Sequence, residues 1–213
     1  MFIRRLLVGP IQTNAYVVAH EASREAIAID PGGPPNPILE VLKQNSFQLQ
    51  AIINTHGHGD HMAGNVPLKD ATGAPVWVHE ADAAMLTDAH ANLLAWAGVN
   101  VKTAPADRTL REGDAITIGD KDPNPVILRV IHTPGHTPGG MSLVGEGVVF
   151  CGDSLFAGGI GRTDLPGGSE YLLLESIREK LLSLPDETIV YPGHGPETTI
   201  GQERRHNPFL QGL

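Results

Sequence analysis

The side chains best suited to chemistry in this sequence are three histidines and a carboxylate that lie within six consecutive positions. They occur in the stretch Thr-His-Gly-His-Gly-Asp-His as His56, His58, Asp60 and His61. Imidazole nitrogens and carboxylate oxygens together suit zinc, iron or manganese. His56 and His58 could face one ion, while Asp60 and His61 could face a second ion a few ångströms away. A polar loop whose histidines coincide by chance is the alternative, which this spacing disfavours.

The elements that must position these side chains are strands that end in tight turns. The apolar residues 49–53 predict a buried strand directly before the histidine-rich stretch. Gly57 and Gly59 alternate with the histidines, which disfavours a helix and favours a tight loop at the strand end. The same order of buried strand, glycine or proline, and ligand-type residue recurs at His136, Asp153 and His194. Rigid strands that converge on one edge of the sheets would give a metal site its positional precision.

The rest of the chain divides into two halves in which strands are followed by helices. We predict strands at residues 2–8, 15–19, 26–29, 49–54, 75–79, 126–131, 141–144, 148–150 and 188–191. We predict helices at residues 37–45, 63–71, 80–97 and 198–205, and a helix capped by Ser169 that buries Leu173, Ile177, Leu181 and Leu184. Gly113 and Asp114 indicate a hairpin within residues 109–118. This order favours two sheets sandwiched between helical layers.

The composition excludes several classes of function. The 213 residues fit a single domain, residues 1–213, with a sizeable core. The formal net charge of −9 argues against binding to nucleic acid or to an anionic membrane. Gly9 and Pro10 interrupt the first apolar run, so neither a signal peptide nor a membrane span is expected. Cys151 is the single cysteine, which excludes an internal disulfide and favours a cytoplasmic protein.

Other residues near these motifs are expected in supporting or structural positions. The histidines outside the metal-ligand motifs are expected at the surface or in structural roles: His20, His79, His90, His132 and His206. His79 ends a strand and could support a ligand. Asp30 also ends a strand, where it either forms a turn or accepts a hydrogen bond from a ligand histidine. Cys151 is expected to point away from the ligand Asp153 and to pack in a core, not to act in redox chemistry.

In combination, these motifs resemble the metallo-β-lactamase superfamily and, within it, glyoxalase II and the shorter glyoxalase II-like hydrolases. The resemblance rests on THGHGDH at residues 55–61, TPGHTPG at 133–139, CGDSLF at 151–156 and YPGHGP at 191–196. QTNAY at residues 12–16, DPG at 30–32 and NPFL at 207–210 also match, so the resemblance covers nearly the whole chain. It implies the α+β class, as an αββα sandwich of two mixed β-sheets flanked by helices. It also implies a dinuclear metal site between the sheets.

The resemblance assigns seven metal ligands. The first ion would be bound by His56, His58 and His136, the second by Asp60, His61 and His194, and Asp153 would bridge the two. Five neutral imidazoles and two carboxylates leave two divalent cations with a net positive centre, which lowers the pKa of a bridging water toward neutrality. We expect two divalent metal ions, zinc in the first place, with iron or manganese as alternatives.

The resemblance to glyoxalase II implies hydrolysis of S-lactoylglutathione, or of a related glutathione-derived thioester, to lactate and glutathione. The expected chemistry is attack of a metal-bridging hydroxide on the thioester carbonyl, whose oxyanion the metal pair stabilises. A thioester suits this chemistry because a thiolate leaves without help from a strong general acid. Asp60 and Asp153 are the predicted catalytic residues, and Asp60 could act as a general base if only one ion is bound.

Three features depart from the glyoxalase II pattern. Full-length glyoxalase II carries a helical C-terminal extension with basic residues for glutathione, whereas this sequence ends at Leu213. The Gly-Lys-aromatic-Tyr loop of the family is Gly-Arg-Thr-Asp at residues 161–164, and a family tyrosine is replaced by Pro196. We predict that Arg162 binds a substrate carboxylate. A bridge from Arg162 to Asp164 that stabilises the loop is the alternative.

Two other functions are compatible with the same residues. The Gly-Arg-Thr-Asp loop also resembles persulfide dioxygenases of this superfamily, which hold a single iron on two histidines and an aspartate and act on glutathione persulfide. A non-catalytic metal-binding protein on this fold is the second alternative, which the complete ligand set disfavours. The acidic balance disfavours RNA processing, and β-lactamases usually lack a histidine at the position of His61. The sequence does not indicate an oligomeric state.

Overall fold

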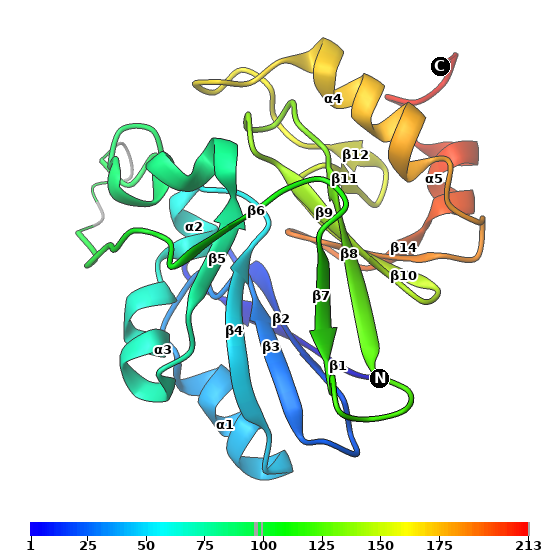
Figure 1. The fold of residues 1–213 in the computed structure, drawn as a ribbon. Helices are drawn as coiled ribbons and strands as arrows, with labels where there is room; N and C mark the ends of the chain where they lie inside the picture. Colours follow the sequence, from blue (N-terminus) through cyan, green and yellow to red (C-terminus); the bar gives the residue numbers. More distant parts are fainter. Residues whose placement is uncertain (96–97, 99, 213) are drawn as a thin grey trace.

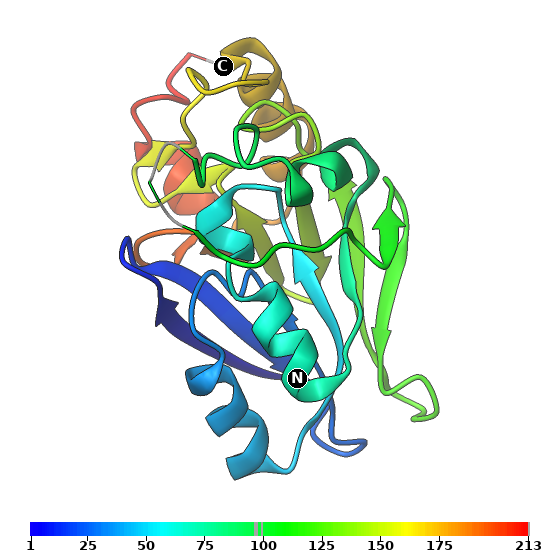
Figure 2. The same cartoon turned by 90° about the vertical axis from the view of Figure 1, so that its left-hand side faces the viewer.

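Two β-sheets packed face to face form the centre of the structure, a computed structural model that describes residues 1–95, 98 and 100–212. Helices cover the outer face of each sheet (Figure 1), and the view in Figure 2 shows the helices that cover the first sheet. Both sheets contain parallel and antiparallel strand pairs. The predicted αββα sandwich of two mixed sheets is therefore confirmed.

The N-terminal part of the chain builds the first sheet, whose six strands among the described residues have the order β1-β2-β3-β4-β5-β6. Neighbouring strands are antiparallel from β1 to β3 and parallel from β3 to β6. The strands are β1 (Phe2–Val8), β2 (Thr13–Ala19), β3 (Glu25–Ile29), β4 (Gln48–Asn54), β5 (Val76–His79) and β6 (Arg108–Leu110). Helices α1 (Asn36–Asn45) and α3 (Asn65–Thr72) lie on its outer side, at the left of Figure 1.

The second sheet has the strand order β14-β13-β10-β9-β8-β7 in the described part of the chain, and only the β10–β13 pair is parallel. Its strands are β7 (Ala115–Ile118), β8 (Val126–His132), β9 (Met141–Gly145), β10 (Val148–Gly152), β13 (Ile189–Pro192) and β14 (Thr198–Thr199). A small hairpin, β11 (Leu155–Phe156) and β12 (Gly159–Ile160), follows β10. Helices α4 (Glu170–Ser176) and α5 (Ile200–His206) cover the outer face (Figure 1).

Among the described residues, three apolar cores hold these layers together, and the alternation of side chains along each strand decides which core a residue enters. In β4, Ile52 packs in the core beneath α1 and α3, whereas Ile53 packs in the core between the sheets. In β10, Val149 packs with residues of α4 and α5, whereas Phe150 packs between the sheets. All four side chains are fully buried, and burial of such side chains is the main free-energy gain that joins the layers.

Most predicted elements are confirmed to within two residues at each end. Ser169 caps α4 by accepting a hydrogen bond from Leu172 N at 3.4 Å. This helix continues as a π-helical turn, η2 (Ile177–Leu181), and ends before Leu184. The helix predicted at residues 198–205 begins at Ile200, because the two preceding residues pair with β13 as strand β14. No helix in the described part of the chain has the length and apolar composition to cross a membrane.

The helix predicted at residues 80–97 is wrong. Only a 3₁₀ helix, η1 (Glu80–Thr87), forms, and turns follow it up to residue 95. Trp96 and Ala97 lie outside the described residues. The Asp88 side chain accepts two hydrogen bonds from backbone amides, and Asn92 Nδ2 donates to Met85 O at 2.9 Å. These short polar side chains bind backbone groups that a helix would use, so they favour turns.

The hairpin predicted at residues 109–118 is also wrong. Strand β6 pairs with β5 in the first sheet, whereas β7 pairs with β8 in the second, so this segment carries the chain from one sheet to the other. The turn itself is present, because Gly113 has a φ of 85° and its amide donates to Val130 O at 2.9 Å. A turn signal locates a bend but does not choose the partner strands.

The histidine-rich stretch contains one helical turn that the sequence disfavours, α2 (Gly59–Met62). Gly59 allows Leu94 to pack closely against this turn, since an added Cβ atom would lie 2.5 Å from Leu94 Cδ2. Its presence therefore does not prevent a helix. Residues 55–58 still form a loop after β4, as predicted, and Asp60 and His61 lie on the new turn.

Candidate metal centre

The predicted metal ligands follow strands that end at one edge of the two sheets. Strands β8, β10 and β13 run in the same direction, so their C-terminal ends share an edge. Thr55, directly after β4, joins the sheets because its carbonyl accepts a hydrogen bond from Met141 N at 2.9 Å. His56 and His58 follow β4, Asp60 and His61 lie on α2, and His136, Asp153 and His194 follow β8, β10 and β13. The strand ends thus bring all seven predicted ligands together.

These seven side chains form three overlapping groups, and within each group the candidate ligand atoms lie within 4.8 Å of one another. The groups are His56–His58–His136, His56–His61–Asp153 and Asp60–His61–His194. The Asp153 carboxylate lies 3.4 Å from His61 Nε2, 3.6 Å from His136 Nε2 and 3.7 Å from His194 Nε2. Asp153 therefore lies between the two ends of the cluster, where a bridging ligand has to lie.

Four buried polar atoms of the cluster have no hydrogen bond among the described residues: His56 Nε2, His58 Nε2, His61 Nε2 and Asp153 Oδ1. Buried polar atoms in proteins are nearly always hydrogen-bonded. His61 Nε2 lies 3.2 Å from Asp60 Oδ2, close enough for an ion pair but not aligned as a hydrogen bond. His58 Nδ1 and His136 Nε2 face each other at 2.9 Å, an approach that a shared cation would satisfy. The residues present therefore fit divalent cations.

At the first end of the cluster, His56 and His58 are held neutral, which is the protonation state that a metal ligand requires. Burial, followed by the nearby His136 and His61 rings, lowers the pKa of His58 to about 3. Burial also lowers the pKa of His56 well below its ordinary value, and His61 adds to this effect. Their lone pairs are therefore available at neutral pH.

At the second end, carboxylates and imidazoles carry opposite charges. Burial raises the pKa of Asp60 and Asp153, but His61 and the other imidazoles around them together outweigh burial and hold both pKa values below the usual range. Burial lowers the pKa of His61 and His194, but the surrounding carboxylates, Asp60 and Asp153 among them, together outweigh burial and raise both pKa values. The side chains of Asp60 and His194 are 26% and 27% exposed, so this end of the cluster is the one that solvent reaches.

Residues outside the cluster orient its imidazoles. His61 Nδ1 donates to Asp30 Oδ2 at 3.0 Å, and His136 Nδ1 donates to the Arg162 carbonyl at 2.7 Å. Each hydrogen bond leaves the Nε2 atom to face the cluster. Asp30 also accepts hydrogen bonds from Thr55 N and Oγ1 at 2.7 and 2.6 Å, which hold it at its φ of 51°. Of the two alternatives for Asp30, the hydrogen bond from a predicted ligand histidine is therefore present.

Sequence reasoning missed two buried polar residues that support the ligand loops. Asn14 holds the loop of His194, because its side-chain amide donates to the carbonyls of Pro192 and Gly195, both at 2.9 Å. Asp82 lies on η1 with no exposed surface and accepts three hydrogen bonds from two ligand loops. The QTNAY motif that contains Asn14 is visible in the sequence, whereas no motif marks Asp82.

Three further residues have definite positions. His79 belongs to none of the three groups and stacks on His132 with ring centroids 4.1 Å apart. Cys151 is buried in the core beneath α4, and burial raises the pKa of its thiol to about 12, which fits the predicted packing role. The Arg162 guanidinium forms two hydrogen bonds to the Asp164 carboxylate, at 2.9 and 2.8 Å. The loop bridge considered as an alternative for Arg162 is therefore present.

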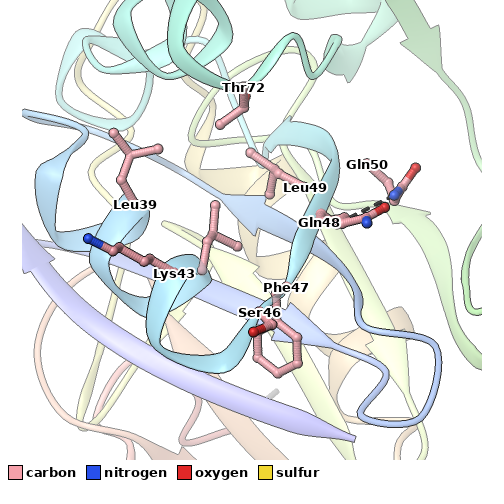
Figure 3. A pocket seen from close by; sticks show the side chains of 9 residues that line it. Leu39, Lys43, Ser46, Phe47, Gln48, Leu49, Gln50 and Thr72 are labelled. Carbon is pink, nitrogen blue, oxygen red and sulfur yellow. Dashed lines mark hydrogen bonds between the residues drawn. The ribbon is translucent and has the colours of Figure 1, made fainter.

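Figure 3 shows a hollow of about 560 Å³ that none of the candidate ligands lines. It is bounded by α1 and by the residues that lead into β4, and includes Lys43, Phe47 and Gln48. These residues lie at the start of β4, whereas the histidine-rich stretch follows its end. The hollow is thus at the opposite end of the strand from the candidate ligands.

Comparison with known proteins identifies the family. A family model described as the metallo-beta-lactamase superfamily matches residues 8–194, and the chain belongs to this superfamily. Its fold and its histidine and aspartate groups are those of a metal-dependent hydrolase. The probable metallo-hydrolase YqgX of Bacillus subtilis is 41% identical over 213 residues, which cover 99% of this chain and 98% of YqgX. The hydroxyacylglutathione hydrolase GloC of Haemophilus influenzae is 36% identical over 214 residues, or 99% of this chain and 98% of GloC.

Solved structures show the same similarity. The BLEG-1 B3 metallo-beta-lactamase has a TM-score of 0.92 and 43% identity, over 99% of this chain and 100% of BLEG-1. TTHA1623 in a di-iron-bound form has a TM-score of 0.84 and 39% identity, over 99% of this chain and 100% of TTHA1623. ETHE1 from Myxococcus xanthus has a TM-score of 0.79 and 32% identity, over 100% of this chain and 85% of ETHE1. The relatives thus include proteins with different named activities.

Proposed function

We propose that the chain is a metal-dependent thioester hydrolase that binds two divalent cations, zinc in the first place, and acts on S-lactoylglutathione or a related acyl-glutathione. The observation that carries the proposal is the cluster of seven ligand-type side chains, four of whose buried donor atoms lack a hydrogen bond. The 36% identity to the hydroxyacylglutathione hydrolase GloC supports the choice of substrate class.

The side chains at the two ends of the cluster would hold different cations. When bound, two divalent cations supply a Lewis acid for the carbonyl oxygen and a water of lowered pKa. His56, His58 and His136 would hold the first cation, while Asp60, His61 and His194 would hold the second, with Asp153 between them. Thr13 Oγ1 donates to Asp60 Oδ2 at 3.1 Å and so orients that carboxylate. With the second site empty, Asp60 would be placed to accept a proton from water.

A turnover assay tests this proposal. The zinc-reconstituted chain should release thiol from S-lactoylglutathione without consuming oxygen. A simple acyl thioester and a β-lactam serve as comparison substrates, the latter because a relative is named a β-lactamase. Thiol release that is absent, or slower than β-lactam opening, would contradict the assignment to thioesters.

A second candidate is iron-dependent oxygenation of glutathione persulfide. The Gly-Arg-Thr-Asp loop at residues 161–164 favours it, and the di-iron form of TTHA1623 shows that iron binds to a protein 39% identical to this chain. The presence of Asp60, His61 and His194 beside the first group weighs toward hydrolysis, because a second cation would occupy space that a mononuclear iron leaves open. Oxygen uptake by the iron-reconstituted chain, without thioester cleavage under zinc, would favour this candidate. Bound metal without either turnover would indicate a metal-binding protein.

A substitution at Arg162 tests its predicted role in substrate recognition. If its guanidinium binds a substrate carboxylate, Arg162→Ala should raise KM roughly tenfold with little change in kcat. Asp164→Ala is the matched control, since it breaks the same ion pair but leaves the guanidinium free to bind substrate. Steady-state kinetics of both variants with S-lactoylglutathione distinguish the two roles. Equal changes in both variants, or instability with unchanged KM, would show that the pair only stabilises its loop.

A further inference from the structure

Asp82 is a buried carboxylate that faces three hydrogen-bond donors. Its Oδ2 atom accepts from Gly57 N at 2.9 Å and from Thr137 Oγ1 at 2.7 Å, and its Oδ1 atom accepts from Gly139 N at 2.6 Å. The residue has no exposed surface. A buried charge is costly unless it is fully hydrogen-bonded, so a carboxylate kept here has a specific task. Three donors converge on the two side-chain oxygens. A carboxylate can accept all three hydrogen bonds because both of its oxygens are acceptors, whereas an amide would place a donor NH2 group at one of these positions.

The three donors belong to the two loops that carry the first group of histidines. Gly57 lies between His56 and His58, and Thr137 directly follows His136. The loops come from different sheets, because the first follows β4 and the second follows β8. One carboxylate therefore joins the two loops whose relative position decides whether these three imidazoles can reach one ion.

Both loops also pack closely against η1, the element that carries Asp82. A Cβ atom added to Gly139 would lie 2.6 Å from Asp82 N and 2.7 Å from Asp82 Cγ. A Cβ atom added to Gly57 would lie 2.6 Å from Met85 Cβ. Glycines at these two positions let the backbone amides approach the carboxylate, so each of the two loops has a residue that permits the close contact with η1.

The second group of ligands is supported by other residues. Asp30 accepts from His61, Thr13 donates to Asp60, and Asn14 holds the loop of His194. None of the hydrogen bonds of Asp82 in the described residues involves these three supports. Loss of Asp82 should therefore affect the two ends of the cluster unequally.

We propose that Asp82 is a positioning residue that holds the loops of His56, His58 and His136 together and so determines the affinity of the first metal site. This inference rests on the proposed metal centre. It also explains why a charged residue lies in η1 with no contact to solvent. The expected effect of losing a residue that supports metal ligands is a ten- to hundredfold loss of metal affinity.

The test measures zinc affinity in two backgrounds that separate the sites. His194→Ala weakens the second site and leaves the first to be measured, whereas His58→Ala does the reverse. Asp82→Asn should lower the zinc affinity about ten- to hundredfold in the His194→Ala background and less than about twofold in the His58→Ala background. Metal-stripped protein is titrated with zinc against a chromophoric chelator, and the absorption spectrum of the cobalt(II)-substituted chain reports a changed ligand geometry without any turnover.

A milder pair of variants keeps the test informative if Asp82→Asn fails to fold. Thr137→Val removes one donor to Asp82 and should lower the affinity of the first site severalfold. Thr133→Val is the control, since it removes a buried hydroxyl of the same loop that contacts Ser142 and Ser154 instead; its zinc affinity should change less than about twofold. Equal losses in Thr137→Val and Thr133→Val, or equal losses of Asp82→Asn in both backgrounds, would overturn the role of Asp82.

The wild-type titration separates failure of this inference from failure of the metal centre. A wild-type chain that binds no zinc would overturn the metal centre and the role of Asp82 with it. A wild-type chain that binds zinc at both sites, together with unchanged affinity in Asp82→Asn, would overturn the role of Asp82 alone.

Discussion

Asp153→Asn should remove at least one metal ion and lower the hydrolysis rate by about a hundredfold or more. Asp153 lies within 3.7 Å of imidazole nitrogens from both ends of the cluster. The amide keeps the shape of the side chain but loses the negative charge that would balance part of the charge of two cations. Metal analysis of the purified variant and its kcat with S-lactoylglutathione measure the two effects.

Ser154→Ala is the matched control for that substitution. Ser154 is the next residue and is also buried, but its hydroxyl donates to Thr133 and not to the cluster. This variant should keep its metal content and lose at most a little stability. Near-normal metal content and activity in Asp153→Asn would mean that the bridging position has been assigned to the wrong residue.

Removal of the metal should abolish hydrolysis, with a loss of at least about a thousandfold. Polarisation of a carbonyl and activation of water by metal ions are worth several kcal/mol, and each ~1.4 kcal/mol corresponds to a factor of ten in rate. None of the side chains in the described cluster replaces a Lewis acid. The measurement is the rate of thiol release after dialysis against a chelator and after zinc is added back.

The control for metal removal is a measurement that shows whether the chain stays folded. Circular dichroism should show the same secondary structure before and after chelation, because the three apolar cores hold the sheets without the cluster. Full thioesterase activity in the metal-free chain would contradict the proposed chemistry, as would activity that zinc does not restore.

The strands and the ligand set could be predicted because both are local features of the sequence. Short apolar runs mark strands such as β4 and β10, and ligand-type residues follow within two positions of their ends. The seven candidate ligands then meet because strand ends share an edge. Their binding of metal is still a prediction, since only their proximity follows from the structure.

The features that could not be predicted depend on contacts between distant parts of the chain. Strand β7 pairs with β8 rather than with β6, and nothing within residues 109–118 distinguishes these partners. The helix predicted from the propensity of residues 80–97 gives way to turns before residue 95, because Asp88 and Asn92 bind backbone groups. Asp82 shows no local signal, since its donors lie 25 to 57 positions away.

The central claim is that seven side chains of this chain form a site for two metal ions. The most direct test is the number of ions per chain, measured by elemental analysis after reconstitution with excess zinc and removal of unbound metal. The two overlapping ends of the cluster predict a ratio that approaches two. A ratio that stays at one under these conditions would contradict the dinuclear centre.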